Sequence, residues 1–177
     1  MVDYGKMADS GKADAISTGA IEMAAPAITR KELLDRLGVE FPEASHSVGD
    51  YDIEELWRGG CRLRQRYDKR ALRPGGTHAG ATMMALGDFA TYIAVLSAIG
   101  WVPLAVTTNL TINFLRKPAP GGLVAECQLL KLGKRLAVGQ VTIWAEGDEE
   151  PVAHATATYS IPPLDNALAN GNIEPKT

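Results

Sequence analysis

The residue of this chain best suited to chemistry is Asp88, an acid inside an apolar segment with the period of a helix. From Gly75 the sequence reads GGTHAGATMMALGDFATYIAVLSAIG, and between Met83 and Ile99 apolar side chains leave almost no polar face, which predicts a helix buried nearly all round. A carboxylate is costly there unless another group pairs with it or a reaction uses it. Asp88 is therefore a candidate general base or nucleophile, or an acid whose hydrogen bonds serve packing alone.

Glycines directly before this helix offer a second chemical group, the free backbone N–H. The N–H groups beside Gly75, Gly76 and Gly80 could hold an anion or a developing oxyanion. Asp88 follows Gly80 by eight positions, which is roughly 12 Å along a helix, too far for both to act on one small reacting group. Two subunits with antiparallel helices would place Gly80 of one beside Asp88 of the other, so the site would be shared.

Alternating segments flank this helix and position it. Five of them are predicted as strands: residues 57–68, 104–115, 123–132, 135–146 and 151–161. Short connections indicate antiparallel neighbours. One strand, one long helix and four strands predict an α+β domain whose antiparallel sheet wraps around the helix. Because a single sheet covers one side of a helix, the remaining apolar surface predicts a second subunit, most simply in a two-fold dimer.

The alternation also assigns faces within two of these strands. Over residues 104–115 it places Leu110 and Ile112 on one face and Thr107 on the other. Over residues 57–68 it gathers three arginines on one face, which we interpret as a solvated strand face: Arg62, Arg64 and Arg66.

The chain is predicted to consist of four parts. They are a mobile arm (residues 1–27), a short helix with its linker (28–49), the domain (50–161) and an exposed tail (162–177). The short helix is expected over residues 28–38, because Thr29 can cap its start, Glu32 can complete a capping box and Gly38 can end it.

Composition excludes several classes of protein. The net charge of −3 gives no support for nucleic-acid binding. Cys61 and Cys127 are too few for a disulfide framework or a metal set, and both are predicted as small buried hydrophobes. Residues 81–99 approach the length of a membrane span, but their polar residues favour a core helix. Since the N-terminal residues contain no secretory signal, a cytoplasmic location is expected.

Four ordered segments between residues 73 and 163 resemble the hot-dog-fold acyl-CoA thioesterases of the phenylacetate-pathway (PaaI-like) group. They are GGTHAGATMMALGD, AVTTNLTINFLRKPAPGG, LLKLGKRLAVGQVTI and PVAHATATYSI. The resemblance implies a homodimer, often paired into a homotetramer, that hydrolyses the thioester of an acyl-coenzyme A. It implies no cofactor, because coenzyme A belongs to the substrate. It also implies that Asp88 is the catalytic acid, that the Gly80 N–H polarises the thioester carbonyl, and that Thr107 orients water or the carboxylate.

The chain departs from this group at two places. Typical members carry His-Gly-Gly with the acid nine positions after the histidine, whereas His78 precedes Asp88 by ten and Ala79 stands at the ninth. His78 is therefore either a site residue shifted by one position or a neighbour in the turn. Arg73 stands where relatives often have asparagine. These departures leave open a non-catalytic acyl-CoA-binding protein and, with less support from the spacing, a hot-dog hydratase or dehydratase.

Cationic side chains are expected near the mouth of such a site, because coenzyme A carries phosphates. The candidates are basic residues at strand ends. The turn residue Ala79 and Met84, which is close to Asp88 in the sequence, are added to them. Together the predicted substrate-binding residues are Ala79, Met84, Arg116, Lys117, Lys134 and Arg135.

Overall fold

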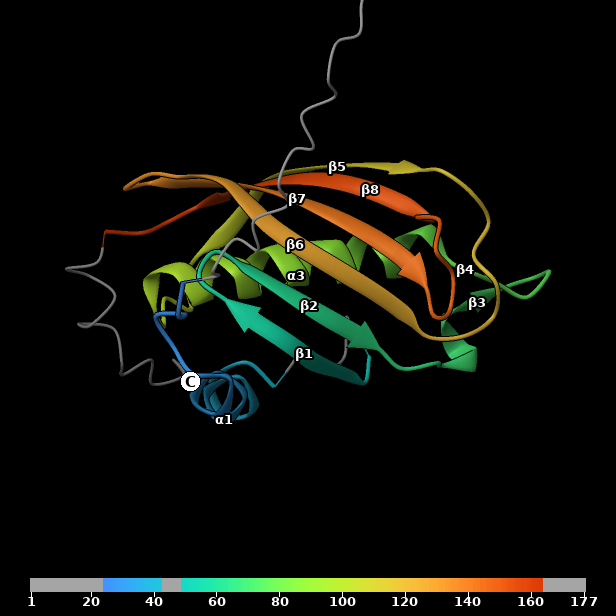
Figure 1. The fold of residues 1–177 in the computed structure, drawn as a ribbon, viewed down its shortest axis with the longest axis horizontal. Coiled ribbons are helices and arrows are strands. Elements are labelled where there is room, and N and C mark those ends of the chain that lie inside the picture. The colour runs from blue at the N-terminus through green and yellow to red at the C-terminus, as the bar shows by residue number, and fades with distance from the viewer. Residues whose placement is uncertain (1–23, 43–48, 164–177) are drawn as a thin grey trace, which may run out of the picture.

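In a computed structural model of the protein, residues 24–42 and 49–163 are described. An antiparallel six-stranded sheet in the order β1-β2-β6-β7-β8-β5 curves around the long helix α3 (Gly80–Ile99) (Figure 1). The strands are β1 (Tyr51–Trp57), β2 (Gly60–Gln65), β5 (Val106–Phe114), β6 (Leu123–Leu132), β7 (Leu136–Ala145) and β8 (Ala153–Ser160). This architecture confirms the predicted α+β fold, with an antiparallel sheet wrapped around a long central helix.

The sheet has one more strand before the helix than the sequence analysis predicts. The segment 57–68 was expected as one strand, but β2 begins at Gly60 and pairs with β1 across a turn at Gly59, whose φ is +78°. Strand β1 lacks a clean alternation because its register shifts between Ile53 and Glu55. Glu54 is the extra residue of this bulge, and a bulge hides a two-residue period.

A small two-stranded sheet precedes α3. It pairs β3 (Leu72–Arg73) with β4 (Thr77–His78), after the short 3₁₀ helix η1 (Lys69–Ala71). The turn between the two strands uses positive φ at Gly75 and Gly76, which glycine adopts without steric cost. This sheet lies at the N-terminal end of α3 (Figure 1) and so fixes where the helix begins.

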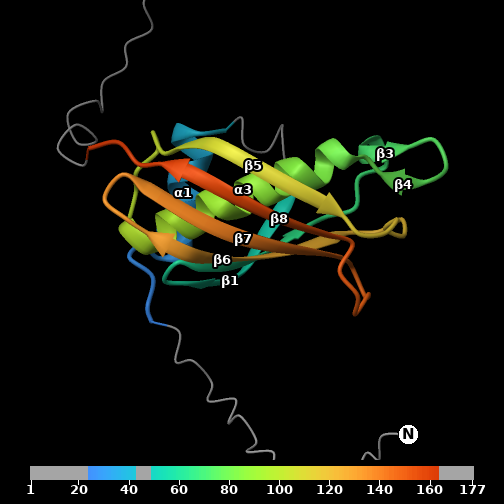
Figure 2. The same ribbon diagram turned by 90° about the horizontal axis from the view of Figure 1, so that it is seen from above.

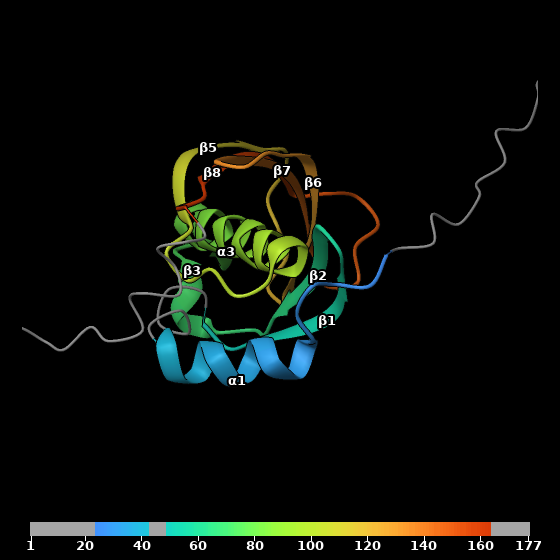
Figure 3. The same cartoon turned by 90° about the vertical axis from the view of Figure 1, so that its left-hand side faces the viewer.

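Helix α1 (Arg30–Glu40) covers a side of the core that the sheet leaves open (Figure 3). Thr29 caps it as predicted, with its Oγ1 accepting from the Glu32 N–H at 3.2 Å. The predicted end at Gly38 is wrong, because the helix continues to Glu40 and the Phe41 N–H still donates to the Leu37 carbonyl. Leu33 and Leu37 are fully buried. Their packing therefore stabilises the helix beyond Gly38.

Residues before α1 also belong to the packed domain. The Ala24 carbonyl accepts from the Arg58 N–H at 2.9 Å, and the Ala27 N–H donates to the Ser97 carbonyl at 2.7 Å. The core therefore starts earlier than the predicted domain boundary at residue 50. The predictions for residues 1–23, 43–48 and 164–177 lie outside the described residues.

Helix α3 is the centre of the core. It has the length and apolar composition of a membrane span, but 72% of that stretch is buried inside the protein, as in a core helix. Cys61 and Cys127 face each other across β2 and β6, and both are fully buried. Burial raises the pKa of the Cys127 thiol to about 12 and that of Cys61 well above its ordinary value, which confirms both as buried hydrophobes rather than reactive thiols.

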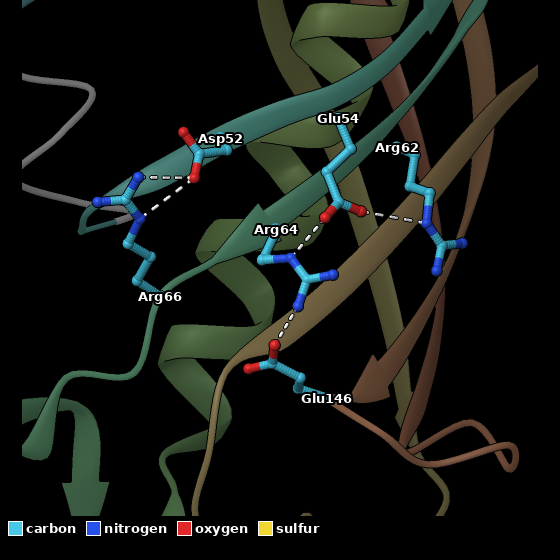
Figure 4. A network of polar contacts seen from close by, with 6 residues as sticks. All are labelled: Asp52, Glu54, Arg62, Arg64, Arg66 and Glu146. Atoms are coloured by element: carbon cyan, nitrogen blue, oxygen red, sulfur yellow. Dashed lines mark hydrogen bonds and ion pairs between the residues drawn. The ribbon is translucent and has the colours of Figure 1, made fainter.

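The outer face of β1 and β2 carries a network of ion pairs (Figure 4). The bulged Glu54 accepts from the Arg64 Nε at 2.5 Å and from the Arg62 Nε at 3.3 Å. Arg62 also pairs with Glu126 of β6 at 3.1 Å, and Arg64 with Glu146. The predicted solvated arginine face is therefore a face of mutually neutralised charges.

Replacing Glu54 should weaken the attachment of β1. In Glu54→Gln the shared carboxylate of two arginines is lost, and we expect the free energy of unfolding to fall by about 1 kcal/mol, since these side chains remain partly exposed. Urea denaturation at low and high salt measures the effect, which screening should reduce. The control is Glu55→Gln, an exposed neighbour. Equal midpoints for the two variants would contradict the assigned role.

Candidate active site

Asp88 lies in the middle of α3, beside the edge of the sheet formed by β8 and β5. It is half-buried and lines a pocket of about 470 Å³. The expectation of a helix buried nearly all round holds from Phe89 to Ala98, where every residue is buried, whereas several residues between Gly80 and Asp88 are partly exposed. The pocket is otherwise largely apolar, and its lining includes Phe41, Ala85, Phe89, Tyr92, Pro103 and Ala105.

Two hydroxyl groups hold one oxygen of the Asp88 carboxylate. Thr107 Oγ1 donates to Oδ1 at 2.5 Å, and the Tyr159 hydroxyl donates to the same oxygen at 2.8 Å. Within residues 24–42 and 49–163, no protein group donates to Oδ2. Charge-assisted hydrogen bonds of this kind stabilise and orient a carboxylate. The arrangement leaves Oδ2 as the oxygen available to a bound molecule.

Tyr159 is a site residue that the sequence analysis missed. It lies on β8 directly opposite Thr107 of β5, so the two hydroxyls reach Asp88 side by side. Burial, and then the negative charge of Asp88, raise the pKa of Tyr159 far above its usual value, so the phenol remains a hydrogen-bond donor. The alternation of residues 151–161 places Tyr159 on the inner face, but only the register between β5 and β8 reveals its partner.

A bulge in β5 brings Thr107 to the site. Its register with β8 shifts between Thr107 and Asn109, which makes Thr108 an extra residue. Because strand side chains alternate, one extra residue turns Thr107 onto the same face as Leu110. The predicted placement of Thr107 on the opposite face from Leu110 is therefore wrong, although its predicted partnership with Asp88 is present.

The start of α3 presents free backbone N–H groups. Gly80 is the first helical residue, and its N–H and that of Ala81 have no acceptor among the described residues. Ala79, in contrast, donates its N–H to the Ala71 carbonyl and accepts from Thr82. A Cβ on Gly80 would lie 3.0 Å from the Phe114 ring, so close packing favours glycine here.

Comparison with known proteins identifies the family. The sequence model of the thioesterase superfamily matches residues 75–152. A solved candidate thioesterase of Silicibacter sp. TM1040 is 41% identical and has a TM-score of 0.71, with 80% of this chain and 97% of that one covered. The chain belongs to the thioesterase superfamily. This membership confirms the predicted class of enzyme, a thioester hydrolase.

Two more distant structures share the fold. A hypothetical thioesterase from Streptococcus pneumoniae, solved with coenzyme A, is 21% identical over 67% of this chain and 90% of its own, with a TM-score of 0.60. The E. coli PaaI protein is 22% identical over 72% of this chain and 90% of its own, with a TM-score of 0.62. At these identities the likeness shows the fold, and it agrees with the predicted hot-dog, PaaI-like architecture.

His78 of the thioesterase belongs to β4 and lies just before the first residue of α3. It is 3% exposed, its Nε2 lies 2.8 Å from the Gly121 carbonyl, and its buried Nδ1 has no partner among the described residues. The adjacent Thr77 hydroxyl donates to the Pro118 carbonyl. Neither residue lines the pocket of Asp88. These contacts tie β4 to the loop after β5, which is a positioning role for the start of α3.

The predicted binding residues do not gather within one subunit. Arg116 Nη2 pairs with Asp148 at 2.8 Å, whereas the Lys117 Nζ donates to the Gly75 carbonyl at 3.2 Å, near the start of α3. Lys134 and Arg135 belong to the β6–β7 turn, at the opposite end of the sheet from the segment after β5 (Figure 2). Met84 is 42% exposed and does not line the pocket.

Removing the phenol should slow the enzyme without weakening substrate binding. In Tyr159→Phe the Asp88 carboxylate keeps Thr107 but loses its second donor, and we expect kcat for thioester hydrolysis to fall about ten- to a hundredfold at an unchanged KM. Steady-state kinetics over a range of pH measure this. The matched control is Tyr67→Phe, because Tyr67 is half-exposed and does not line the pocket of Asp88. An unaltered kcat in Tyr159→Phe would remove this residue from the site.

Proposed function

We propose that this thioesterase hydrolyses an acyl-coenzyme A to the free acid and coenzyme A, in a site shared by two subunits. The observation that carries the proposal is the Asp88 carboxylate, fixed through one oxygen and with the other facing a largely apolar pocket. A coenzyme A complex in a protein of the same fold supports the choice of thioester. A cytoplasmic location and the pairing of dimers into tetramers stay predictions.

The surface around the site supports a dimer. Strand β5 is an edge of the sheet, and along its outer side no other described strand pairs with it, so its backbone groups there can pair with a second copy. Exposed apolar side chains surround this edge: Met84, Leu104, Val106, Phe114 and Leu115. Two-fold pairing of β5 with its own copy would bury this apolar strip.

The same pairing completes the active site. In an antiparallel pair centred near Leu110, the start of β5 meets the end of the partner's β5. Thr107, and with it Asp88, then lies near the end that carries Phe114, whose ring packs on Gly80. Gly80 of the partner subunit would thus approach Asp88 of the first, although within one helix the two are roughly 12 Å apart.

The proposed reaction uses both groups. The Gly80 and Ala81 N–H groups of the partner hold the thioester carbonyl oxygen and stabilise the oxyanion. Oδ2 of Asp88 takes a proton from water as the water oxygen attacks the carbonyl carbon. The carbon–sulfur bond then breaks, and the coenzyme A thiolate takes up that proton. Direct attack by Oδ2, with hydrolysis of the resulting anhydride, uses the same geometry.

Pairing would also gather the cationic side chains. The Arg135 carbonyl accepts from the Ile161 N–H, directly after β8, so the β6–β7 turn lies near the start of β5. In the antiparallel dimer that end meets Lys117 of the partner. We therefore assign the coenzyme A phosphates to Lys117, Lys134 and Arg135. Arg116 is a weaker choice, because Asp148 and Glu150 already neutralise it.

Asp88→Asn tests the function directly. The amide oxygen can still accept from both hydroxyls but cannot take a proton or attack, so we expect kcat to fall at least a hundredfold. Acyl-CoA hydrolysis measures it, with the exposed Asp35→Asn as control. Full activity in Asp88→Asn would refute the mechanism. A wild-type protein that binds a non-hydrolysable acyl-CoA analogue but never cleaves the thioester would instead be an acyl-CoA-binding protein.

The shared site has its own test at Gly80. Proline fits the first helical position and removes its N–H, and the preceding Ala79 has the extended backbone that proline requires (φ −69°, ψ 143°). Gly80→Ala is the matched control, because it adds the same Cβ against Phe114 and keeps the N–H. We expect Gly80→Pro to lose at least about a hundredfold in kcat relative to Gly80→Ala.

Mixed dimers then decide whether two subunits contribute. A dimer of one Gly80→Pro and one Asp88→Asn subunit contains one intact site if the groups act across the interface, so co-refolding the two inactive variants should restore activity. If each site lay within one subunit, both sites of the mixed dimer would be damaged and activity would stay at the level of the single variants.

A further inference from the structure

The pocket beside Asp88 follows one stripe of helix α3. Helix α3 lines it with Ala85, Asp88, Phe89 and Tyr92, a spacing that places all four on one stripe of the helix. Among the described residues, no part of α3 beyond Tyr92 lines the pocket. Tyr92 lies one turn past Asp88, which is roughly 6 Å of helical rise. The space on that side of the carboxylate is therefore short.

Two aromatic rings lie at the short end, Tyr92, which is buried, and Phe41, which is 38% exposed. The ring of Phe41 stands edge-on against Tyr92, with centroids 5.9 Å apart and an interplanar angle of 83°. Tyr92 packs 6.4 Å from Phe89 and donates its hydroxyl to the Pro103 carbonyl at 3.3 Å. Because burial raises the pKa of Tyr92 to about 12, this donor is retained at neutral pH. The wall is held by ring packing and by a hydrogen bond.

Phe41 reaches this wall from outside the sheet-and-helix unit. It directly follows α1, whose Leu37 is buried and whose Glu40 accepts from the Trp101 Nε1 at 2.9 Å. The Arg36 guanidinium lies 5.7 Å from the centre of the Trp101 ring. Helix α1 is thus anchored to the residues after α3, and this anchoring sets the position of Phe41.

We propose that Phe41 and Tyr92 form the end wall of the acyl pocket, so that α1 restricts the enzyme to short acyl chains. The inference rests on the proposed function, since it assigns the apolar end of the Asp88 pocket to the acyl group. Phe89, Pro103 and Ala105 line that end, and the phosphates require the cationic, solvent-facing side instead. A chain longer than the space before Phe41 must displace a packed ring, which costs contact and burial.

Straight-chain acyl-CoAs of increasing length, from acetyl to palmitoyl, test the wall. We expect kcat/KM of the wild type to fall steeply beyond short chains. Phe41→Ala should move the optimum to longer chains and raise kcat/KM for octanoyl-CoA about tenfold or more relative to butyryl-CoA. Phe41→Trp should move the preference toward shorter chains. The control is Val39→Ala. Val39 lies near the end of α1, is 82% exposed and does not line the pocket, so the chain-length profile of this variant should match that of the wild type.

Stability must be separated from selectivity. Phe41→Leu keeps an apolar anchor of smaller volume, and it should give an intermediate profile at an unchanged thermal midpoint. An active wild type whose chain-length profile is the same in Phe41→Ala, Phe41→Leu and Phe41→Trp would overturn this inference and leave the proposed function intact. A wild type that hydrolyses no acyl-CoA of any length would overturn both.

Discussion

The structure depends on one geometric constraint, which is that a single curved sheet cannot enclose a helix that is apolar on every face. Helix α3 is buried on every side from Phe89 to Ala98, but in its first half one stripe, which includes Ala85 and Asp88, remains partly exposed. Hydrophobic burial favours covering this stripe as well. Helix α1 covers the end near Tyr92 through Phe41, and the exposed apolar strip along β5 is the surface that we propose for a second subunit. The Asp88 pocket lies between α1 and this strand, since Phe41, Val106 and Thr107 all line it.

The same stripe explains how a carboxylate is tolerated in an apolar helix. Asp88 is half-buried rather than enclosed, and two hydroxyls compensate for the water it has lost. Both come from neighbouring strands, and the bulge at Thr108 gives them a common direction. A bulge that costs a ladder hydrogen bond is thereby coupled to the orientation of the one acid in α3. Both hydrogen bonds go to Oδ1, so Oδ2 is left without a protein donor among the described residues, and this is the oxygen that the proposed mechanism uses.

Much of this was predictable from the sequence, because α3 and strands β6 to β8 have uninterrupted periods. Asp88, Gly80 and Thr107 are identified by the apolar helix, its glycine start and the family resemblance. The features that the sequence does not predict depend on strand register and on packing between distant segments. Strand β1 is obscured by its bulge and its acids, and Tyr159 becomes a partner of Thr107 only when β8 pairs with β5. Likewise, Gly38 is a reasonable helix end until the burial of Leu37 outweighs it.

The positions of the charged side chains then limit how a substrate can be oriented in the site. The arginines of β2 are neutralised by Glu54, Glu126 and Glu146, so the outer face of that strand has little attraction for phosphate. Lys117 has no carboxylate partner among the described residues, and its ammonium lies beside the turn that leads into α3. In the proposed dimer, a phosphate bound to Lys117 of one subunit would lie on the same side of the site as the N–H groups of Gly80 and Ala81. In the proposed complex the acyl chain would leave Asp88 in the other direction, toward the rings of Tyr92 and Phe41.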